Sequence, residues 1–218
     1  MSEKKTSRRT LLIAGVGVAA LAGVAGGTLL FGGNAEATVA TGARAPAFSV
    51  ADADGRTRTL DEFRGRLVVL EWTNHGCPYV RKHYDSRTMQ TLQQDATTDG
   101  VVWLQVISSA PGEQGHLDAA GARARVQTDG ARATATLLDP SGTMGRAYGA
   151  LTTPHMYIIS PEGVVLYQGA IDDRPSARPA SLEGATSYVR AALADIAAGR
   201  AVQTAQTVPY GCNVKYAG

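Results

Sequence analysis

Apolar and polar positions follow one another in blocks that predict a sheet with helices packed against it. Short apolar runs at residues 67–72, 101–107 and 133–138 are typical of buried strands. The stretches between them, about 78–95 and 116–127, have partly apolar or alanine-rich patterns that favour helices. The order strand, helix, strand, helix, strand predicts an α/β domain with a central mixed sheet flanked by helices.

Signals on either side of this central block predict the remaining elements. Turn-forming residues interrupt apolar segments at both ends of the chain, as expected between paired strands. The expected elements are an N-terminal hairpin extension at 48–50 and 57–60, a short helix at 143–148, a hairpin at 155–159 and 164–167, a helix at 182–198 and an irregular tail at 200–218.

Residues 1–37 have the pattern of an export signal. A basic start precedes an apolar or glycine-rich run at residues 11–31, broken only by Thr28, and Ala35-Glu36-Ala37 offers the small residues that a signal peptidase needs. Ser7-Arg8-Arg9-Thr10-Leu11-Leu12 resembles the twin-arginine signal. We expect cleavage near Ala37, which leaves a mature domain at 38–218; an uncleaved membrane anchor is the alternative. Both place the domain outside the cytoplasm, in the periplasm or another extracytoplasmic space, where disulfides persist.

The charge of the chain belongs to this N-terminal segment. The formal net charge is +2, and residues 1–37 account for all of it, so the remaining 181 residues are balanced. A balanced domain argues against a nucleic-acid partner, and we expect membrane contact only through the N-terminal signal. With 44% hydrophobic and 18% charged residues, the composition excludes a disordered or collagen-like chain.

The two cysteines, Cys77 and Cys212, are the candidates for chemistry. Two cysteines are too few for a disulfide-rich scaffold or a four-cysteine zinc or iron–sulfur site. Cys77 follows a predicted strand and precedes Pro78, so it would be the N-cap of a helix whose unpaired amides stabilise a thiolate. Asn74 and His75 lie close to it in sequence. The position predicts a nucleophilic or redox thiol; a buried, inert cysteine is the alternative.

Several motifs, taken together, resemble the thioredoxin fold in its peroxiredoxin-like branch, the alkyl hydroperoxide reductase and thiol-specific antioxidant family. They are Gly42-Ala43-Arg44-Ala45-Pro46-Ala47-Phe48, Leu60-Asp61-Glu62-Phe63-Arg64-Gly65, the run from Val68 to Cys77-Pro78, Thr153-Pro154-His155-Met156-Tyr157-Ile158-Ile159, Pro161-Glu162-Gly163 and Tyr167-Gln168-Gly169. Asn74-His75-Gly76-Cys77-Pro78-Tyr79-Val80 and Gly211-Cys212-Asn213-Val214-Lys215-Tyr216 are similar to a narrower subgroup without established peroxidase activity.

The resemblance implies a thiol-dependent oxidoreductase, an antioxidant or a thiol-disulfide enzyme, that needs no cofactor. Cys77 would attack a peroxide or a disulfide, and Cys212 would resolve the intermediate, with a thiol or disulfide reductant as partner. Pro154, which on sequence grounds could be ordinary punctuation at a strand edge, would form a cis-proline loop facing Cys77. The residues expected to line this site are Asn74, His75, Pro78, Tyr79, Thr153 and His155.

Two departures from the family limit what the resemblance implies. Position 80 is Val80, so the vicinal cysteine pair of thioredoxins is absent. Typical peroxiredoxins have threonine or serine three residues before the reactive cysteine, where this chain has Asn74; the nearest threonine is Thr73. The sequence therefore leaves peroxide and disulfide substrates both open.

The sequence also leaves a non-catalytic interpretation open. A Cys77–Cys212 disulfide could staple the tail to a domain that binds a partner or a metal, or the two thiols could be independent. His75 and His83 are weak candidates as copper or zinc ligands, although we expect no metal. Asp172-Asp173-Arg174 is interpreted as a solvated loop, with a wall of the approach to Cys77 as the alternative.

Overall fold

The structure is a computed structural model that describes residues 39–218. The predicted export signal and its cleavage site lie outside the described residues and stay predictions. Within residues 39–218, no helix is both long enough and apolar enough to cross a bilayer.

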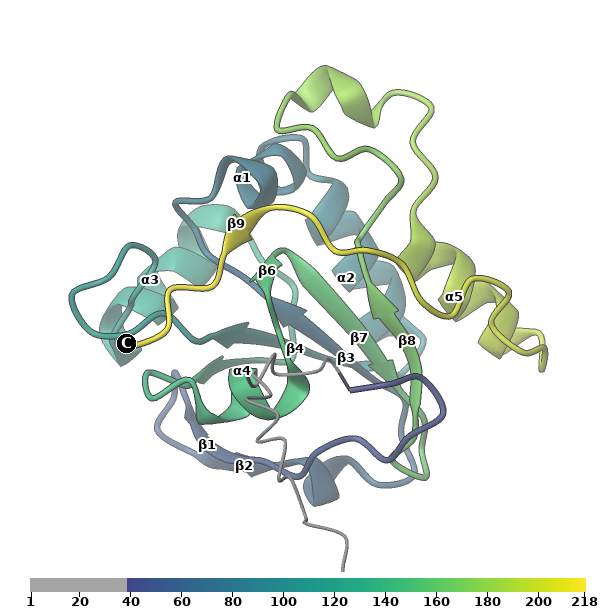
Figure 1. Cartoon of the computed structure of the whole chain (residues 1–218), viewed down its shortest axis with the longest axis horizontal. Coiled ribbons are helices and arrows are strands. Elements are labelled where there is room, and N and C mark those ends of the chain that lie inside the picture. The colour runs from purple at the N-terminus through teal and green to yellow at the C-terminus, as the bar shows by residue number, and fades with distance from the viewer. Residues whose placement is uncertain (1–38) are drawn as a thin grey trace, which may run out of the picture. The chain divides into compact units, whose positions relative to one another are not determined.

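A seven-stranded sheet forms the centre of the domain, in the order β2-β1-β5-β4-β3-β7-β8 (Figure 1). Its strands are β1 (Ser49–Asp52), β2 (Thr57–Thr59), β3 (Val68–Trp72), β4 (Val102–Ile107), β5 (Ala135–Leu138), β7 (His155–Ile159) and β8 (Val165–Gly169). Strands β3, β4 and β5 are parallel, and the other pairings are antiparallel. The predicted mixed sheet and both predicted hairpins are confirmed.

Helices cover both faces of this sheet. They are α1 (Pro78–Asp85), α2 (Thr88–Thr98), α3 (Ala119–Asp129), α4 (Thr143–Tyr148) and α5 (Tyr188–Ala197), with 3₁₀ turns η1 (Leu60–Phe63) and η2 (Pro179–Leu182). Helices α1, α2 and α5 pack on the face that carries Val69 and Trp103. Helix α4 and η1 pack on the opposite face with Leu70 and Leu104. Because both faces are covered, every residue of β3 and β4 is buried.

The sequence predicts one continuous helix at 78–95, and this prediction was wrong, because the segment forms the two helices α1 and α2. Arg87 separates them with φ 63°, a left-handed conformation that non-glycine residues rarely adopt. The hydroxyls of Ser86 and Thr88 both donate to the carbonyl of His83. Side-chain bonds of this kind compete with the helical ladder and end α1.

Two helix starts differ from the sequence prediction because side chains cap the helices later in the chain. Asp118 accepts from the amide of Gly121, so α3 begins at Ala119 rather than at His116. Ser187 accepts from the amide of Arg190, so α5 begins at Tyr188 rather than at Leu182.

The C-terminal tail is not wholly irregular, as the sequence predicts it to be. Strand β9 (Cys212–Asn213) pairs antiparallel with β6 (Thr152–Thr153).

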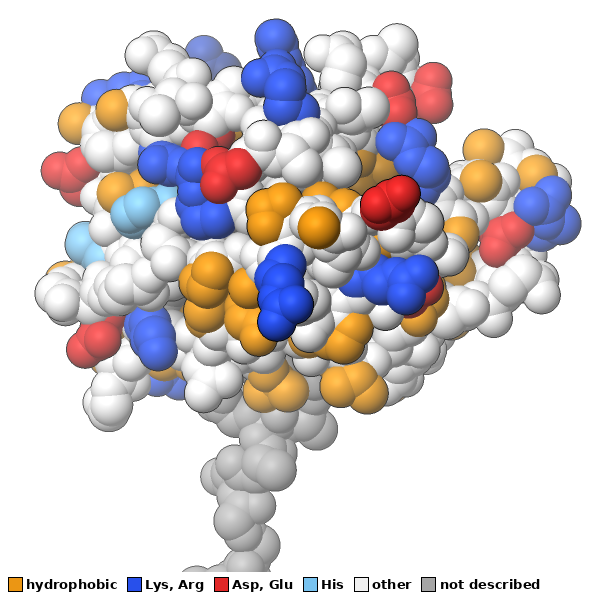
Figure 2. All heavy atoms as spheres, turned by 90° about the horizontal axis from the view of Figure 1, so that it is seen from above, with side chains coloured by type: hydrophobic (Ala, Val, Ile, Leu, Met, Phe, Trp, Pro, Cys, Tyr) orange, Lys and Arg blue, Asp and Glu red, His pale blue; other side chains and the backbone are white. Residues whose placement is uncertain are grey.

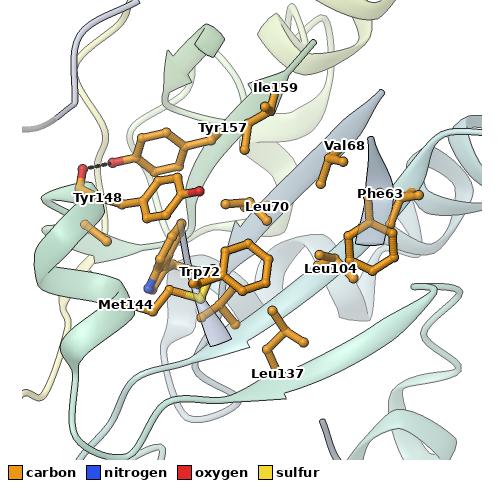
Figure 3. Packing of buried hydrophobic residues seen from close by; sticks show 14 of the residues in the cluster. Phe63, Val68, Leu70, Trp72, Leu104, Leu137, Met144, Tyr148, Tyr157 and Ile159 are labelled. Carbon is orange, nitrogen blue, oxygen red and sulfur yellow. Dashed lines mark hydrogen bonds between the residues drawn. The ribbon is translucent and has the colours of Figure 1, made fainter. Parts of the chain in front are cut away.

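An aromatic cluster fixes the C-terminal end of β3, from which the chain continues to Cys77 (Figure 3). The rings of Trp72, Tyr148 and Tyr157 have centroid separations of 5.2–5.4 Å and tilted or edge-on orientations. The indole of Trp72 donates to Ser108 over 3.1 Å, and the Tyr157 hydroxyl donates to the carbonyl of Tyr148 over 2.9 Å. These bonds satisfy buried polar atoms and hold β3, β4 and α4 in fixed positions.

A buried carboxylate fixes α1 on the other face of the same strand. Glu71 is fully buried and accepts from the Tyr84 hydroxyl, the Gln93 amide and the Trp103 indole over 2.7–2.9 Å. Burial raises the pKa of Glu71, and these bonds oppose that rise. Because Tyr84 belongs to α1, the bond to Glu71 ties this helix, whose first turn follows Cys77, directly to β3.

On the face viewed in Figure 2, basic and acidic side chains are interspersed rather than gathered in one basic region. Apolar side chains lie among them near the middle of this view.

Candidate functional site

The register of the sheet brings together two segments that are far apart in the sequence. Trp72, the last residue of β3, pairs with His155, the first residue of β7. The loop that leaves β3 carries Cys77, and the loop that enters β7 carries Pro154. The Thr153–Pro154 peptide bond is cis, as predicted. Pairing of the two strands therefore places Cys77 and Pro154 at the same end of the sheet.

Cys77 is the N-cap of α1, with Pro78 at the first helical position, as the sequence predicts. Its carbonyl accepts from the amides of Val80 and Arg81 over 3.0 and 2.8 Å. Its sulfur makes no capping bond to the helix and is fully buried. The thiol thus lies at the positive end of the helix dipole.

The sulfur of Cys77 has two close neighbours. The carbonyl oxygen of Thr153 is 3.1 Å away and accepts a bond from the thiol. The sulfur of Cys212 is 2.7 Å away, and both cysteines are free thiols in this structure. The strand pairing explains the approach, because Thr153 and Cys212 are register partners in the ladder between β6 and β9.

Gly211 is the residue that lets the tail approach so closely. It has φ 140°, and a Cβ at this position would overlap the carbonyl group of Thr153, the same group that accepts from Cys77. A residue with a side chain would push the tail away from the loop. The Gly211-Cys212 pair in the sequence therefore has a direct steric explanation.

The surroundings of the two sulfurs differ. Cys212 is partly exposed and belongs to β9 in the tail rather than to a helix. Burial, followed by the bond to Cys77, raises the pKa of Cys212. Cys212 therefore stays protonated at neutral pH. It has to lose this proton before it can attack a neighbouring sulfur.

Asn74 shapes the loop before Cys77. Its side-chain oxygen accepts from the amide of Gly76 over 2.9 Å, and its side-chain amide donates to both oxygens of Gln114. Gly115 packs so closely on Asn74 that a Cβ there would overlap its carboxamide. The Asn74 side chain thus joins two loops.

The other predicted lining residues have distinct surroundings. Tyr79 is partly exposed and contacts Tyr210 of the tail, with ring centroids 5.9 Å apart and ring planes tilted by 59°. His155 is buried, bonds to Gln168 over 3.2 Å and accepts from the amide of Leu151. His75 is half-buried, and the nearest charges to it are those of Arg125 and Asp129 near α3.

The two weak metal candidates do not share a site. His75 is influenced by charges on α3, whereas the ring of His83 lies 3.7 Å from Asp172. Across the part of the chain that the structure describes, no three histidine, cysteine, aspartate or glutamate side chains converge as metal ligands do.

The residue three positions before Cys77 is Asn74, and the neighbouring Thr73 is buried. The threonine or serine of typical peroxiredoxins is therefore absent at that position.

Asp172 is buried rather than solvated, so the sequence interpretation of this turn was wrong for that residue. The Tyr210 hydroxyl donates to it, and the ammonium of Lys82 lies 3.6 Å from its other oxygen. Lys82 is itself buried, donates to the carbonyl of Arg174 and lies 5.0 Å from the Tyr210 ring centroid. Sequence reasoning missed this cluster, although Tyr210 stands two positions before Cys212.

The buried histidines predict a loss of stability in mild acid. Burial lowers the pKa of His83 and of His155 to about 4, and Asp172 and Lys82 are the charged groups beside His83. The unfolded chain binds these protons near pH 6.5, so stability is complete above that value and falls as the pH drops toward 4. The loss is on the order of 3 kcal/mol per histidine.

Urea unfolding at pH 7.5, 6.0 and 5.0 measures this loss. His155→Gln should flatten the pH dependence, because glutamine keeps a hydrogen-bonding group without the titration. If the free energy of unfolding falls equally in the two proteins between pH 7.5 and 5.0, His155 is not a source of the pH dependence.

Solved structures of other proteins have a similar fold. No curated protein matches the chain. A hypothetical protein from Sinorhizobium meliloti superposes with a TM-score of 0.71 at 26% identity, over 84% of this chain and 97% of that one. An uncharacterized conserved protein from Geobacillus kaustophilus gives 0.71 at 24% identity, over 82% and 93%. The thioredoxin domain of a thiol-disulfide oxidoreductase from Bacteroides vulgatus gives 0.48 at 20% identity, over 60% and 89%.

The family itself follows from the sequence match. The sheet order, the covering helices and the cis-proline loop agree with the expected thioredoxin-like α/β fold. The family model described as "AhpC/TSA family" matches residues 41–168, which is more than half of the chain and includes both Cys77 and Pro154. The chain therefore belongs to the AhpC/TSA family.

Proposed function

We propose that the protein is an extracytoplasmic thiol-dependent oxidoreductase with Cys77 as nucleophile and Cys212 as resolving thiol. The observation that carries the proposal is the 2.7 Å separation of the two sulfurs beside the cis-proline loop. The N-cap position of Cys77 supports its role as nucleophile. The extracytoplasmic location rests on the twin-arginine pattern in residues 1–37.

The chemistry takes two steps at Cys77. Its thiolate attacks one sulfur of a substrate disulfide, forms a mixed disulfide and releases the other sulfur as a thiolate. The thiolate form of Cys212 then attacks the Cys77 sulfur, which releases the substrate's second thiol and leaves a Cys77–Cys212 disulfide. An external dithiol reduces this bond and is itself oxidised.

A peroxide would react in two corresponding steps. Cys77 would displace hydroxide or an alkoxide from the peroxide and become a sulfenic acid, and Cys212 would release water from it as the disulfide forms. Asn74 favours disulfides as substrates, because it stands three residues before Cys77, where a threonine or serine hydroxyl would help a peroxide bind.

The resolving role suits the way the tail is held. Pairing of β9 with β6 keeps Cys212 beside Cys77, while Pro154 and Thr153 shape the opposite wall. The yellow tail in Figure 1 passes directly beside β6 and continues past it. Because Cys77 is fully buried and its sulfur contacts Cys212 of the tail, we expect an external reactant to reach this sulfur when the tail moves aside.

The proposal is tested by adding one equivalent of oxidised glutathione to the reduced protein. We expect a Cys77–Cys212 disulfide within the time of the assay, identified by mass spectrometry of the linked peptides. A non-catalytic domain with a structural staple would instead form this bond once and resist its reduction by dithiols. If both cysteines can still be alkylated after treatment with oxidised glutathione, no Cys77–Cys212 disulfide has formed, and both the catalytic role and the structural disulfide are contradicted.

A further inference from the structure

The span of the C-terminal tail that carries Cys212 is anchored on both sides. Before it, the Thr207 hydroxyl accepts from a backbone amide just after β8 over 2.8 Å. After it, the Tyr216 hydroxyl donates to a backbone carbonyl shortly before β6 over 2.8 Å. A movement that uncovers Cys77 would therefore involve residues 208–215, and the contacts of this span decide how readily it moves.

Tyr210 holds the middle of this span through its hydroxyl. The hydroxyl donates to Oδ1 of Asp172, in the segment that follows β8. The same oxygen accepts from the amide of Arg174 over 2.9 Å, which fixes the direction of the carboxylate. Asp172 is only 3% exposed. A hydrogen bond to a buried carboxylate is stronger than one at the surface, because little water competes for it.

A buried ammonium group holds the carboxylate from the other side. The Lys82 side chain is fully buried, and its Nζ lies 3.6 Å from Oδ2 of Asp172. Nζ also donates to the carbonyl of Arg174 over 2.7 Å and lies 5.0 Å from the centroid of the Tyr210 ring. A buried charge needs such partners, because an unpaired one is costly. We call the side chains of Tyr210, Asp172 and Lys82 the tyrosine latch.

The tyrosine latch connects the two segments that carry the cysteines. Lys82 belongs to α1, whose N-cap is Cys77, and Tyr210 stands two positions before Cys212. The Tyr210 ring also contacts Tyr79 in the first turn of α1. Tyr210 and Cys212 both pack against the buried cluster that includes Cys77. In Figure 1 the yellow tail passes α1 where it reaches β9. Release of Tyr210 would therefore loosen the chain directly beside the redox pair.

We propose that Tyr210 is a positioning residue: the tyrosine latch keeps Cys212 against Cys77 and sets how often an external reactant reaches the Cys77 sulfur. In the closed tail the tyrosine hydroxyl bonds to the carboxylate. In the open tail it bonds to water, while the anchors at Thr207 and Tyr216 stay in place. The control of access to Cys77 stands on its own, whereas the positioning of Cys212 as resolving thiol rests on the proposed function.

Alkylation by iodoacetamide tests the control of access. The full-length Cys212→Ser protein has one thiol, so its alkylation rate reports on Cys77 alone. Tyr210→Phe in this background removes the hydroxyl and keeps the ring. We expect alkylation to become at least about tenfold faster, because the closed tail loses a hydrogen bond to a charged group. Tyr188→Phe, which removes a tyrosine hydroxyl from α5, is the matched control and should leave the rate unchanged.

Low concentrations of urea separate local opening of the tail from unfolding of the domain. Opening of a short span exposes little surface, so the alkylation rate should stay flat in low urea. Asp172→Asn should also speed alkylation, and it should add little in the Tyr210→Phe protein, because both changes break the same bond. If Asp172→Asn does not fold, Tyr210→Phe still decides. Equal rates with and without the Tyr210 hydroxyl, or a rate that rises steeply in low urea, would overturn the control of access.

Tyr210→Phe with both cysteines present tests the positioning of Cys212. After addition of oxidised glutathione, we expect a mixed disulfide at Cys77 to accumulate before the Cys77–Cys212 disulfide forms. The first step gains access, while the second loses its positioned thiol. Resolution of the mixed disulfide at the unaltered rate would overturn this role of Tyr210. Absence of any disulfide in the unaltered protein would instead contradict the proposed function, and the alkylation rates would still decide whether the latch controls access.

Discussion

Replacement of Cys77 by serine is expected to lower the turnover of oxidised glutathione by a dithiol by about 10³-fold or more. A serine hydroxyl is not ionised at neutral pH and cannot form the mixed disulfide that starts the cycle. The loss is large because the remaining residues bind and orient substrate but supply no nucleophile. The rate of reduced glutathione release, in a coupled assay, measures it.

Cys212→Ser is the matched control for this experiment. It keeps the nucleophile and removes the resolving thiol, which lies 2.7 Å from Cys77. We expect one rapid reaction, after which a mixed disulfide with glutathione accumulates and is visible in the intact mass. Serine at position 77 with undiminished turnover would contradict the assignment of the nucleophile. Resolution at the wild-type rate in Cys212→Ser would contradict the role of Cys212.

Gly211→Ala is expected to have the second largest effect. The added methyl group would overlap the carbonyl of Thr153, and φ 140° is strained for any residue but glycine. The tail must then retreat from β6, and Cys212 moves away from Cys77. A displacement that costs about 1–3 kcal/mol slows disulfide formation by roughly 5- to 150-fold.

The rest of the tail should remain in place in this variant. Thr207 bonds to Tyr167 and to the amide of Ala170, and the Tyr216 hydroxyl donates to Ala150. The tail is therefore anchored on both sides of Gly211. We expect the melting temperature to change by only a few degrees, because the sheet and its core are untouched.

Stopped-flow alkylation of the reduced protein by iodoacetamide measures the opening directly. Cys77, which is fully buried and contacts Cys212 of the tail, should react faster in Gly211→Ala than in the unaltered protein. Asn213→Ala is the control, since this exposed residue lies in the same strand and its main chain is unchanged. Equal alkylation and oxidation rates in all three proteins would show that Gly211 does not hold the tail over the site.

Local signals in the sequence were sufficient for the sheet and for the position of Cys77. The apolar runs around β3 and β4 predict buried strands because both faces of the sheet are covered. Pro78 predicts the start of α1 because proline fits the first helical position, and this placed Cys77 at the N-cap. Family motifs supplied the cis-proline loop.

Features that depend on distant partners could not be predicted in this way. Asp172 looks like a loop residue in the sequence, yet Lys82 on α1 and Tyr210 on the tail surround it. The break at Arg87 depends on the hydroxyls of Ser86 and Thr88, which have no periodic pattern. Pairing of β9 with β6 involves two residues on each strand, too few for a hydrophobic alternation.

The equilibrium between the thiols of Cys77 and Cys212 and their disulfide is the most direct test of a working redox pair. The protein is equilibrated in buffers of graded ratios of dithiol to cyclic disulfide and quenched with acid. Free thiols are then alkylated, and the intact mass is measured by mass spectrometry. We predict a reversible transition with a reduction potential above about −300 mV, within reach of thioredoxin-type reductants. A bond that stays closed at all potentials down to that value, or one that never forms, would contradict it.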